Sequence, residues 1–414
     1  MAHDTFRLKL PIQELVTEML NQLPDHIWSD PDIRFLDPAF GGGQFVLEIR
    51  RRLLAAGHSQ ENVAGRVWGC ESLPTRVKYV QNWFKSGLVN LYVRDALTHD
   101  WGNMKFDVIV GNPPYQDNMP DGARKSISTN LWTKFIDKSV TDLLAPNGWC
   151  AMVVPASWAG PTKNLSNNRR ILKDIFAANN TTLLNLDPHL NTHFQQVGST
   201  FSWFMTQKAP YTGSTKIKLS ETEFVHVDLS KVESLPRINH VLAYSINQKY
   251  FAKCGADVIA GQYRESDDQY QEHKTKQYKH PAYHTPADGG RTWYMKTKHP
   301  NHHKHKVMIS LSGRYVPVAD AGTQGYTDMC LAYIVKPDET LESAHSVMNS
   351  KLFHFIMAAN KWSGFNNKQV IRTFALPKLN KIYTDKQIYK WFDLTPEEAQ
   401  FVTNWYAQNI SVDI

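Results

Sequence analysis

Residues 105–115 combine an apolar strand with a turn of nearly fixed shape. The apolar residues of the strand are Phe106, Val108, Ile109 and Val110. A short run of this kind, rich in β-branched residues, is typical of a strand that is covered on both faces in a parallel sheet. It ends in Gly-Asn-Pro-Pro-Tyr, where the prolines fix φ and lack backbone donors. Because open α/β sheets bind ligands at the carboxyl ends of their strands, the stretch predicts an α/β fold with a functional turn at this point.

The turn carries groups that suit an exocyclic amine. Asn112 adds a side-chain oxygen acceptor beside the main-chain carbonyls of Pro113 and Pro114, and Tyr115 adds a flat ring. Such acceptors can take the hydrogen bonds of a planar amino group while a ring stacks on the base that carries it. We therefore expect these residues to form a catalytic site for an amine.

A glycine-rich turn follows the first predicted strand, Ile33 to Leu36. It reads Asp-Pro-Ala-Phe-Gly-Gly-Gly-Gln-Phe over residues 37–45 and precedes a helix predicted from Val46 to Ala56. A turn of this composition lets a ligand approach the backbone closely and presents helix amides to it. The sequence therefore predicts a ligand site beside the first strand.

Two further predicted strands end in acidic residues. The strand from Val63 to Cys70 ends at Glu71, and the strand from Val89 to Val93 is followed by Arg-Asp-Ala, which places Asp95 and Ala96. Glu71 lies roughly 20 to 30 residues beyond the glycine-rich turn, the separation at which a nucleotide-binding acid meets ribose hydroxyls. Carboxylates accept hydrogen bonds from hydroxyl and amino donors, so both acids suit a nucleoside ligand.

Composition sets the outer limits. A chain of 414 residues has room for two domains. Its 46 Lys and Arg against 39 Asp and Glu give a formal charge of +7, a mild excess that favours a polyanionic partner. The four cysteines form no C-x-x-C pair, which argues against a disulfide framework and a zinc knuckle. No apolar stretch is long enough to span a bilayer and no leader is evident, so a cytoplasmic protein is expected.

The second half of the chain differs in composition from about residue 209. Residues 211–229 alternate in strand-like pieces, Val232 to Phe251 reads as a helical linker, and Leu341 to Trp362 carries one amphipathic helical stripe. Between Tyr270 and Lys306, aromatic residues alternate with many basic residues and only two acids. The basic residues of this region are Lys274, Lys276, Lys279, Arg291, Lys296, Lys298, Lys304 and Lys306. The pattern favours a nucleic-acid surface, and the alternative is an exposed, solubilising insertion.

Two polar stretches allow more than one interpretation. The histidines between His299 and His305 suggest a metal site, but adjacent histidines cannot easily face one ion, so a phosphate-contacting or exposed loop is favoured and no metal is expected. The segment from Gln116 to Asn130 suits a mobile loop over the cleft. In it, Arg124 and Lys125 either contact a polyanion or are simply solvated.

The motifs occur in a recognisable order. Phe-x-Asp-Pro-Ala-x-Gly-x-Gly-x-Phe, an acid after each of the next two strands and then Asn-Pro-Pro-Tyr resemble the gamma-type N6-adenine DNA methyltransferases, whose recognition region follows the catalytic domain. The resemblance covers roughly the first half of the chain well. It implies an α/β fold, with a Rossmann-like methyltransferase sheet that has helices on both faces, and a mixed α+β carboxyl-terminal recognition domain. The implied parts are a catalytic domain at 1–208, a connecting segment at 209–251 and a target recognition (DNA-binding) domain at 252–414.

By this resemblance the cofactor is S-adenosylmethionine. Asp37 and the backbone of Ala39 to Gly43 would hold its methionine part, Glu71 its ribose and Asp95 its adenine amino group. The full set of residues expected to bind the cofactor is Asp37, Pro38, Ala39, Phe40, Gly41, Gly43, Phe45, Glu71, Asp95, Ala96 and Asn112.

The resemblance also implies how double-stranded DNA is handled. The target adenine would be flipped out of the duplex to reach the catalytic residues, which are Asn112, Pro113, Pro114, Tyr115 and Phe194. Phe194 leads a hairpin expected from Phe194 to Phe204 and would stack on the far face of the base, unless it is a core residue. The residues expected to contact DNA are Arg124, Lys125, Arg291, Lys296 and Lys298.

Other functions share this chemistry. Enzymes that methylate exocyclic amines in RNA or glutamine side chains in proteins use similar turns. The Asp-Pro-Ala sequence of the glycine-rich turn and the long basic carboxyl-terminal region disfavour a protein substrate. Asn at position 112, rather than Ser or Asp, disfavours methyl transfer to N4 of cytosine. A catalytically silent DNA-binding module is disfavoured because Asp37, Glu71, Asp95 and Asn112 are all present.

Some properties stay open at this point. A fused nuclease is disfavoured, because the amino-terminal helix runs straight into the glycine-rich turn. A cognate restriction endonuclease, the recognition sequence and the oligomeric state are not given by any pattern, because base readout depends on a few side chains.

Overall fold

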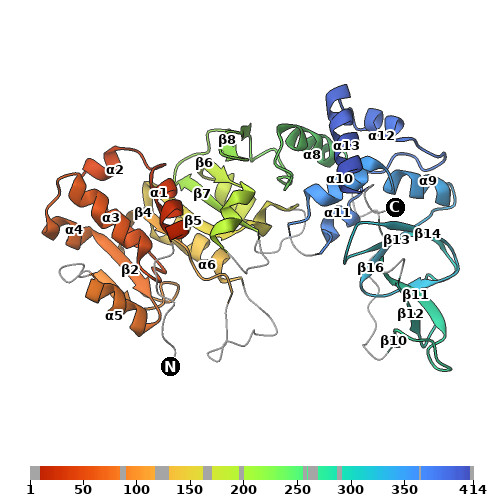
Figure 1. Cartoon of the computed structure of the whole chain (residues 1–414), viewed down its shortest axis with the longest axis horizontal. Helices are drawn as coiled ribbons and strands as arrows, with labels where there is room; N and C mark the ends of the chain where they lie inside the picture. Colours follow the sequence, from red (N-terminus) through yellow and green to blue (C-terminus); the bar gives the residue numbers. More distant parts are fainter. Residues whose placement is uncertain are drawn as a thin grey trace. The chain divides into compact units, whose positions relative to one another are not determined.

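A computed structural model describes most of the chain (Figure 1). The described residues are 10–83, 90–116, 130–161, 170–194, 200–254, 259, 269–286, 291–362 and 365–410. The chain divides into two compact units, one made of residues 1–158 with 165–231 and the other of 159–164 with 232–414. Among the described residues, every helix is too short or too polar to cross a bilayer.

The first unit is built on a nine-stranded mixed sheet in the order β3-β2-β1-β4-β5-β7-β6-β8-β9. The five strands β1 to β5 pair in parallel, whereas β7 runs antiparallel to both β5 and β6. The strand bounds are Phe35–Asp37, Val67–Glu71, Asn90–Val93, Phe106–Gly111, Leu144–Pro155, Asn180–Asn185, Phe201–Gln207, Thr215–Lys218 and Phe224–Val227 for β1 to β9. The α/β sheet expected from the sequence is therefore confirmed.

Helices and helical turns connect these strands. They are α1 (Leu10–Leu20), α2 (His26–Ser29), α3 (Gln44–Ala55), α4 (Gln60–Arg66), α5 (Pro74–Trp83), α6 (Leu131–Asp137), the π-helix η1 (Lys138–Leu143), the 3₁₀ turn η2 (Ala156–Ala159), the π-helix η3 (Ile171–Phe176) and the 3₁₀ turn η4 (Pro188–His193).

Apolar side chains on one face of α3 explain how it packs. Val46, Ile49 and Leu53 are fully buried and share a core with Val16 and Met19 of α1. Their three- and four-residue spacing places them on one side of the helix. This packing holds α3 against the sheet, with its amino terminus at the glycine-rich turn.

The second strand is shorter than predicted. Its predicted first residues belong to α4, whose amino terminus is capped by the Ser59 side chain accepting from Asn62 N. The helix ends at Arg66 and β2 begins at Val67. An amino-terminal cap of this type stabilises a short helix. The apolar residues of α4 alone do not predict it.

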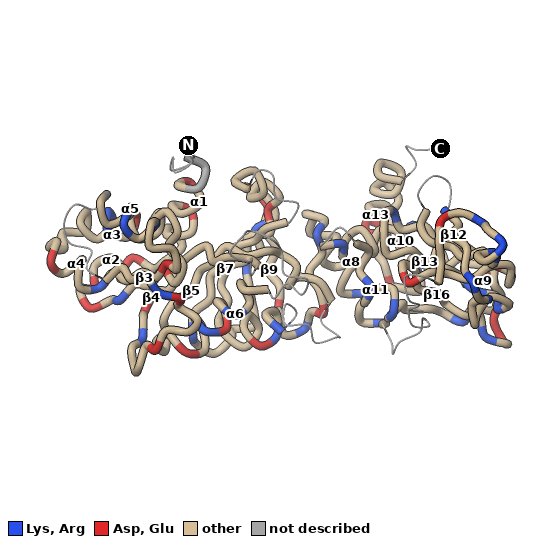
Figure 2. The backbone as a smooth tube through the Cα atoms, turned by 90° about the horizontal axis from the view of Figure 1, so that it is seen from below, with Lys and Arg blue, Asp and Glu red and all other residues tan. Residues whose placement is uncertain are grey.

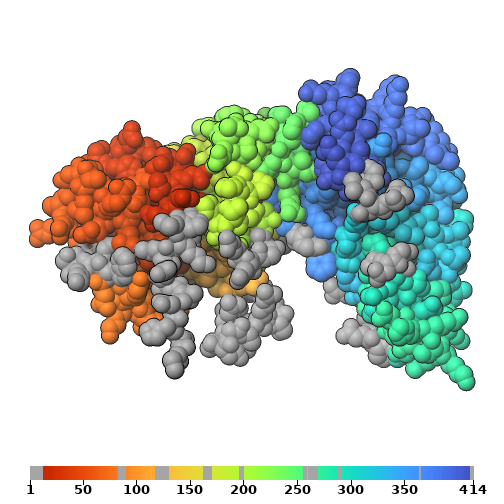
Figure 3. All heavy atoms as spheres, in the orientation of Figure 1, coloured from red at the N-terminus to blue at the C-terminus, as the bar shows by residue number. Residues whose placement is uncertain are grey.

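The second unit is mixed α+β. Its sheets have the strand orders β10-β12-β11-β15 and β14-β13-β16. The strand bounds are Tyr270–Gln271, His280–Thr285, Arg291–Met295, His305–Ser310, Pro317–Ala321, Gly325–Tyr326 and Cys330–Ile334 for β10 to β16. The helices are α8 (Val241–Ala252), α9 (Leu341–Met348), α10 (Lys351–Ala359), α11 (Lys368–Arg372), α12 (Asp385–Trp391) and α13 (Pro396–Asn409). In the view of Figures 1 and 3, strands β10 to β12 lie at one end of this unit and helices α12 and α13 at the other.

Two predicted elements of the second half differ in the structure. The helix predicted from Leu341 to Trp362 is two helices, α9 and α10, which break at Asn349 and Ser350. The helix predicted from Val232 begins only at Val241, where the His240 side chain accepts from Leu242 N. Strands β8 and β9 of the expected connecting segment belong to the large sheet of the first unit, and α8 belongs to the second unit.

Candidate active site

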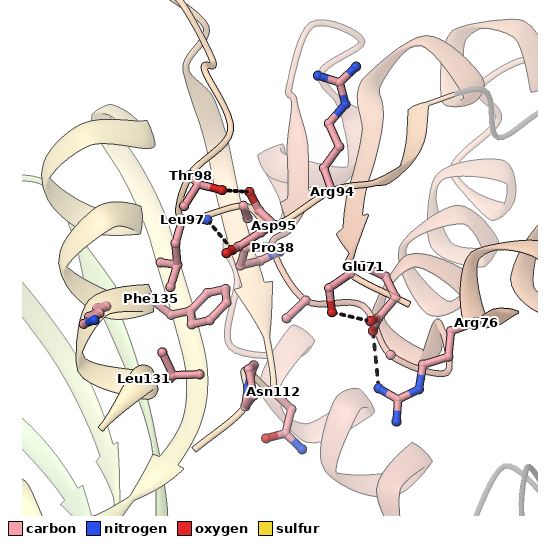
Figure 4. A pocket seen from close by; sticks show the side chains of 16 residues that line it. Pro38, Glu71, Arg76, Arg94, Asp95, Leu97, Thr98, Asn112, Leu131 and Phe135 are labelled. Carbon is pink, nitrogen blue, oxygen red and sulfur yellow. Dashed lines mark hydrogen bonds and ion pairs between the residues drawn. The ribbon is translucent and has the colours of Figure 1, made fainter. Parts of the chain in front are cut away.

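A cavity of about 680 Å³ lies at the carboxyl ends of β1, β2, β3 and β4 (Figure 4). Its lining comes from the turns after these strands, from Arg76 of α5 and from α6. The lining residues are Pro38, Ala39, Gly41, Glu71, Ser72, Arg76, Arg94, Asp95, Ala96, Leu97, Thr98, Asn112, Pro114, Leu131, Lys134 and Phe135. Eight of the residues predicted to bind cofactor or target are thereby brought to one cavity, as the α/β topology requires.

The glycine-rich turn has a backbone that only glycine adopts easily. Gly41 and Gly43 have φ of 53° and 84°, in the left-handed region. The Gly43 amide donates to the Phe40 carbonyl at 2.7 Å, and Phe40 N donates to the Cys70 carbonyl at 3.0 Å. These bonds tie the turn to β2 and leave its Ala39 and Gly41 on the cavity wall.

Asp37 lies under this turn and is not among the lining residues. Its side chain is 1% exposed, and one oxygen accepts from Ala39 N at 3.1 Å. The other oxygen has no hydrogen-bond partner among the described residues. Burial raises the pKa of the Asp37 carboxyl to about 8, and the nearby Glu71 adds to the rise. Asp37 therefore shapes the turn and is largely protonated at neutral pH.

Gly111 is needed where β4 passes Asp37. A Cβ at this position would lie 2.9 Å from Asp37 Oδ1. The missing side chain lets the end of β4 approach β1 closely, which brings Asn112 to the same cavity as the glycine-rich turn.

The Glu71 carboxylate is held by the turn that follows β2. Its Oε1 accepts from Leu73 N at 2.9 Å and from the Ser72 hydroxyl at 3.2 Å. Arg76 of α5 forms an ion pair with Oε2 at 3.4 Å, which Figure 4 also shows. The carboxylate is thus pre-oriented toward the cavity without the loss of side-chain freedom that ligand binding would otherwise impose.

Asp95 also lines this cavity, in the turn that follows β3. Its Oδ1 accepts from Leu97 N at 2.9 Å, so the carboxylate is oriented by its own turn. The neighbouring Arg94 extends away from Asn112 and Phe135 in Figure 4. Its guanidinium contacts His99 at 3.0 Å and lies over the Tyr92 ring. Arg94 and Asp95 both line the cavity, and Asp95 offers it a carboxylate held by its own turn.

An apolar wall from α6 completes the cavity and was not identified from the sequence. Leu131 and Phe135 reach the cavity together with Ala96, Leu97 and Pro114. Figure 4 shows Leu131 and Phe135 pointing inward from one helix. Their four-residue spacing predicts that both side chains lie on one face of a helix. It does not predict whether that face contacts the protein core or a ligand cavity.

The Asn-Pro-Pro-Tyr turn presents two of its four residues to the cavity. Asn112 and Pro114 line it, whereas Pro113 is buried. The Tyr115 hydroxyl donates to Asn112 Oδ1 at 2.5 Å. Burial raises the pKa of the Tyr115 hydroxyl, which keeps it protonated as a donor.

Three other predicted aromatic residues lie outside the cavity lining. Phe40 and Phe45 are buried in the core beneath the sheet. Phe194 follows η4 and is partly buried, and its ring packs on that of Phe201 with centroids 4.4 Å apart. Phe201 begins β7, the second arm of the expected hairpin, while residues 195–199 lie outside the described residues.

The predicted DNA-contacting residues of the second unit lie on or beside β12. Arg291 is exposed and forms an ion pair with Glu272 at 3.3 Å. Lys296 lies over the Tyr278 ring at 5.3 Å, and Lys298 is exposed. Figure 2 shows several basic positions along the backbone around this strand. Arg124 and Lys125 lie outside the described residues.

Lys306, predicted as part of the basic surface, is instead fully buried. It forms an ion pair with Asp320 and donates to the carbonyls of His302 and Lys304 at 3.2 and 3.1 Å. Its apolar neighbours in β13 carry it into the sheet, so that its charge must be paired. This lysine supports the fold and is not available to a polyanion.

The histidine cluster holds no ligand set for a metal. Among the described residues, no three His, Cys, Asp or Glu side chains are grouped closely enough to bind an ion. His299 is 2% exposed, its Nδ1 accepts from Asn301 N, and its ring packs against Tyr326. Burial and the nearby Lys306 lower the pKa of His299 to about 4, so it is neutral.

Comparison with known proteins finds methyltransferases that are similar to part of this chain. The model of the Eco57I restriction-modification methylase family matches residues 56–183. The chain is 31% identical over 127 residues to the Type II methyltransferase M.CvrRI of Paramecium bursaria Chlorella virus XZ-6E, a match that covers 30% of each chain. It is 28% identical over 152 residues to the tRNA1(Val) (adenine(37)-N6)-methyltransferase of Bacteroides fragilis, which covers 33% of this chain and 58% of that protein.

One solved structure is similar over nearly the whole chain. The cryo-EM structure of the DrdV-DNA complex aligns with 97% of this chain and 57% of that one, at a TM-score of 0.51 and 12% identity. At that identity the likeness concerns the fold alone. The sequence matches to curated relatives span less than a third of the viral protein and somewhat more than half of the bacterial one. The chain thus matches the Eco57I methylase family over the segment that carries Glu71, Asp95 and Asn112.

Proposed function

We propose that this protein is a site-specific DNA methyltransferase that transfers a methyl group from S-adenosylmethionine to N6 of adenine. One observation carries the proposal. A single cavity joins the glycine-rich turn, the acids Glu71 and Asp95, and the amide of Asn112. A nucleoside cofactor and an amine acceptor can meet there, and the matched family and relatives are methyltransferases.

The residues of the cavity fit S-adenosylmethionine. The Glu71 carboxylate is pre-oriented to accept from ribose hydroxyls, and Asp95 can accept from an adenine amino group. Leu131 and Phe135 offer apolar surface to the adenine ring, and the backbone of Ala39 to Gly43 offers close approach to the methionine part. Bound S-adenosylmethionine supplies a methyl group activated by its sulfonium charge.

The chain's own contribution to transfer is orientation of the amine. The N6 lone pair of adenine is delocalised into the ring, so the amine is a weak nucleophile. Acceptance of its hydrogens by Asn112 Oδ1 and the Pro113 carbonyl would draw the nitrogen toward tetrahedral geometry and free its lone pair for the methyl group, with the thioether as leaving group and the surplus amine proton passing to solvent. Positioning of this kind is worth on the order of 7 kcal/mol or more. Tyr115 and Phe194 would stack on the extruded base.

Asn112 provides the direct test of this role. We expect Asn112→Ala to lower the turnover rate by at least about 100-fold, because one essential acceptor is removed. Its affinity for S-adenosylmethionine, measured by titration calorimetry, should stay within a few-fold of the parent protein. A loss of cofactor affinity equal to the loss of rate would assign Asn112 a structural role instead.

The second unit is proposed as the target recognition part. It falls largely within residues 252–414, where a recognition domain is expected after a catalytic domain at 1–208 and a connecting segment at 209–251. The exposed Arg291 and Lys298 and the partly exposed Lys296 would contact phosphates. Gln116 and Asn130 form a β-bridge beside the Asn-Pro-Pro-Tyr turn. Arg124 and Lys125 belong to the segment between these two residues. We also propose a cytoplasmic location and a cognate restriction endonuclease, the latter because the matched family is one of restriction-modification methylases.

The experiment that tests the function uses isotopically labelled S-adenosylmethionine. The protein is incubated with duplex DNA, the DNA is digested to nucleosides, and the products are identified by mass spectrometry. Labelled N6-methyl-deoxyadenosine is the expected product, and sequencing that detects N6-methyladenine then reads out the recognition site. Absence of label from DNA would overturn the proposal.

RNA methylation is the second candidate. It is favoured by the similarity to a bacterial tRNA adenine-N6 methyltransferase, which extends over 152 residues. The same incubation with tRNA in place of DNA separates the two. Labelled N6-methyladenosine in tRNA, with none in DNA, would select the RNA enzyme.

A further inference from the structure

Phe201 packs against both of the rings that are assigned to the target base. It is the first residue of β7 and is 1% exposed. Its ring centroid lies 5.1 Å from that of Tyr115 and 4.4 Å from that of Phe194, with interplanar angles of 39° and 36°. Two aromatic residues from segments far apart in the sequence therefore rest on one buried ring.

The backbone of Phe201 is fixed by the sheet. Phe201 pairs with Pro155 at the end of the antiparallel ladder between β5 and β7. Its amide donates to Asn191 Oδ1 at 2.9 Å. Asn191 belongs to η4, and its carbonyl accepts from Phe194 N at 3.0 Å. Both the ring and the main chain of Phe201 thus reach the segment that carries Phe194.

Tyr115 is held at two points. Its hydroxyl donates to Asn112 Oδ1 at 2.5 Å, and its ring packs on Phe201. One lone pair of the oxygen that the target amine needs is therefore engaged by Tyr115, and the second can still accept from the amine. The packing on Phe201 holds the Tyr115 ring independently of this hydrogen bond.

We propose that Phe201 is a positioning residue for the target base. It does not touch the base itself, and it sets the spacing and tilt of Tyr115 and Phe194 between which the extruded adenine stacks. This inference rests on the proposed function. Aromatic stacking depends on interplanar geometry, so a shift of either ring weakens capture of the base without altering the cofactor cavity.

A buried phenylalanine elsewhere on the same strand provides a matched control. Phe204 is three residues further along β7 and 0% exposed, and it packs on Phe176 at 4.7 Å on the opposite face of the sheet. Replacing either phenylalanine with leucine removes one buried ring from the same strand. The comparison therefore separates loss of packing from loss of base positioning.

The experiment uses the full chain and a duplex that carries the mapped recognition site, with 2-aminopurine in place of the target adenine. Fluorescence of 2-aminopurine rises when it leaves the stack, so it reports base extrusion. We expect Phe201→Leu to weaken the extruded complex and raise KM for DNA by about tenfold, the effect of a partly lost stacking contact. The affinity for S-adenosylmethionine should change by less than about twofold, because the cavity lining is untouched. Phe204→Leu should resemble the parent protein in both DNA measurements, with a comparable loss of thermal stability.

A second background tests whether Phe201 acts through the two rings. In a Tyr115→Ala, Phe194→Ala protein, the further change Phe201→Leu should leave the residual 2-aminopurine signal and KM unchanged. An additional loss in that background, or equal effects of F201L and F204L in the parent, would overturn the inference. If F201L does not fold, Phe201→Met, which fills irregular space better, replaces it in the same comparison. A parent protein that methylates no DNA would refute the proposed function itself, whereas a methylating parent with an unaffected F201L refutes only the role of Phe201.

Discussion

At the residue scale, Gly111 and Asp37 depend on each other. A Cβ at Gly111 would lie 2.9 Å from Asp37 Oδ1, the atom that accepts from Ala39 N. Gly111→Ala would push the carboxyl aside and break this bond, so we expect a loss of about 1 to 3 kcal/mol of stability and weaker cofactor binding. Chemical denaturation and calorimetry measure the two effects.

Gly65→Ala in α4, where a Cβ meets nothing within 4 Å, is the control and should be neutral or stabilising. Equal behaviour of both variants would contradict the account.

The buried Asp37 carboxyl also predicts a pH dependence of stability. Burial raises its pKa in the folded protein to about 8, far above the value of an unfolded chain. Between about pH 4 and pH 8 the folded state therefore retains a proton that the unfolded state has lost. Its contribution to the free energy of unfolding decreases as pH rises through this window, by up to about 1.4 kcal/mol per pH unit. Asp37→Asn removes the titration, so its stability should fall less steeply between pH 5 and pH 8 in denaturant titrations. Parallel pH profiles of the two proteins would show that Asp37 ionises normally.

At the element scale, the break between α9 and α10 is stabilised from a third helix. Lys351 N, at the start of α10, donates to Asp385 Oδ1 of α12 at 2.9 Å, and the Lys351 ammonium lies 3.6 Å from the same carboxylate. We expect Asp385→Ala to destabilise the protein by about 1 kcal/mol, the usual cost of a lost helix amino-terminal acceptor. Thermal unfolding measures it against Lys386→Ala, an exposed neighbour on α12 that should have little effect. A stability equal to that of the parent would mean that other groups satisfy the start of α10.

At the scale of the whole molecule, charge on the second unit should govern the affinity for DNA. Lys298 is exposed, so Lys298→Ala is expected to weaken DNA binding on all sequences and reduce the slope of log affinity against log salt by about one. Lys306 is the contrasting case because it is buried in an ion pair with Asp320. Lys306→Met should change stability and leave the salt slope unaltered. If neither variant changes the slope, the surface around β12 is a solvated face and not a DNA contact.

Short-range patterns were enough for the parts of this protein that depend on local chemistry. Apolar runs followed by glycine, proline or acidic turns identified the parallel strands β1 to β4. Recognising these strands needs only the period of the side chains and the conformational limits of Gly and Pro. The expectation that Glu71, Asp95 and Asn112 serve one cofactor came from the resemblance to methyltransferases, and the structure brings all three to one cavity.

Contacts between distant segments were decided only by the tertiary structure. Leu131 and Phe135 form a cavity wall because α6 packs beside β5, and Lys306 is internal because β14 supplies Asp320 opposite it. The break between α9 and α10 depends on a carboxylate from α12. The meeting of Tyr115 and Phe194 on Phe201 likewise joins the turns after β4 and η4 to the start of β7. An amphipathic stripe or a lone charge shows that a residue has a partner but not which one, because burial and pairing depend on groups remote in sequence.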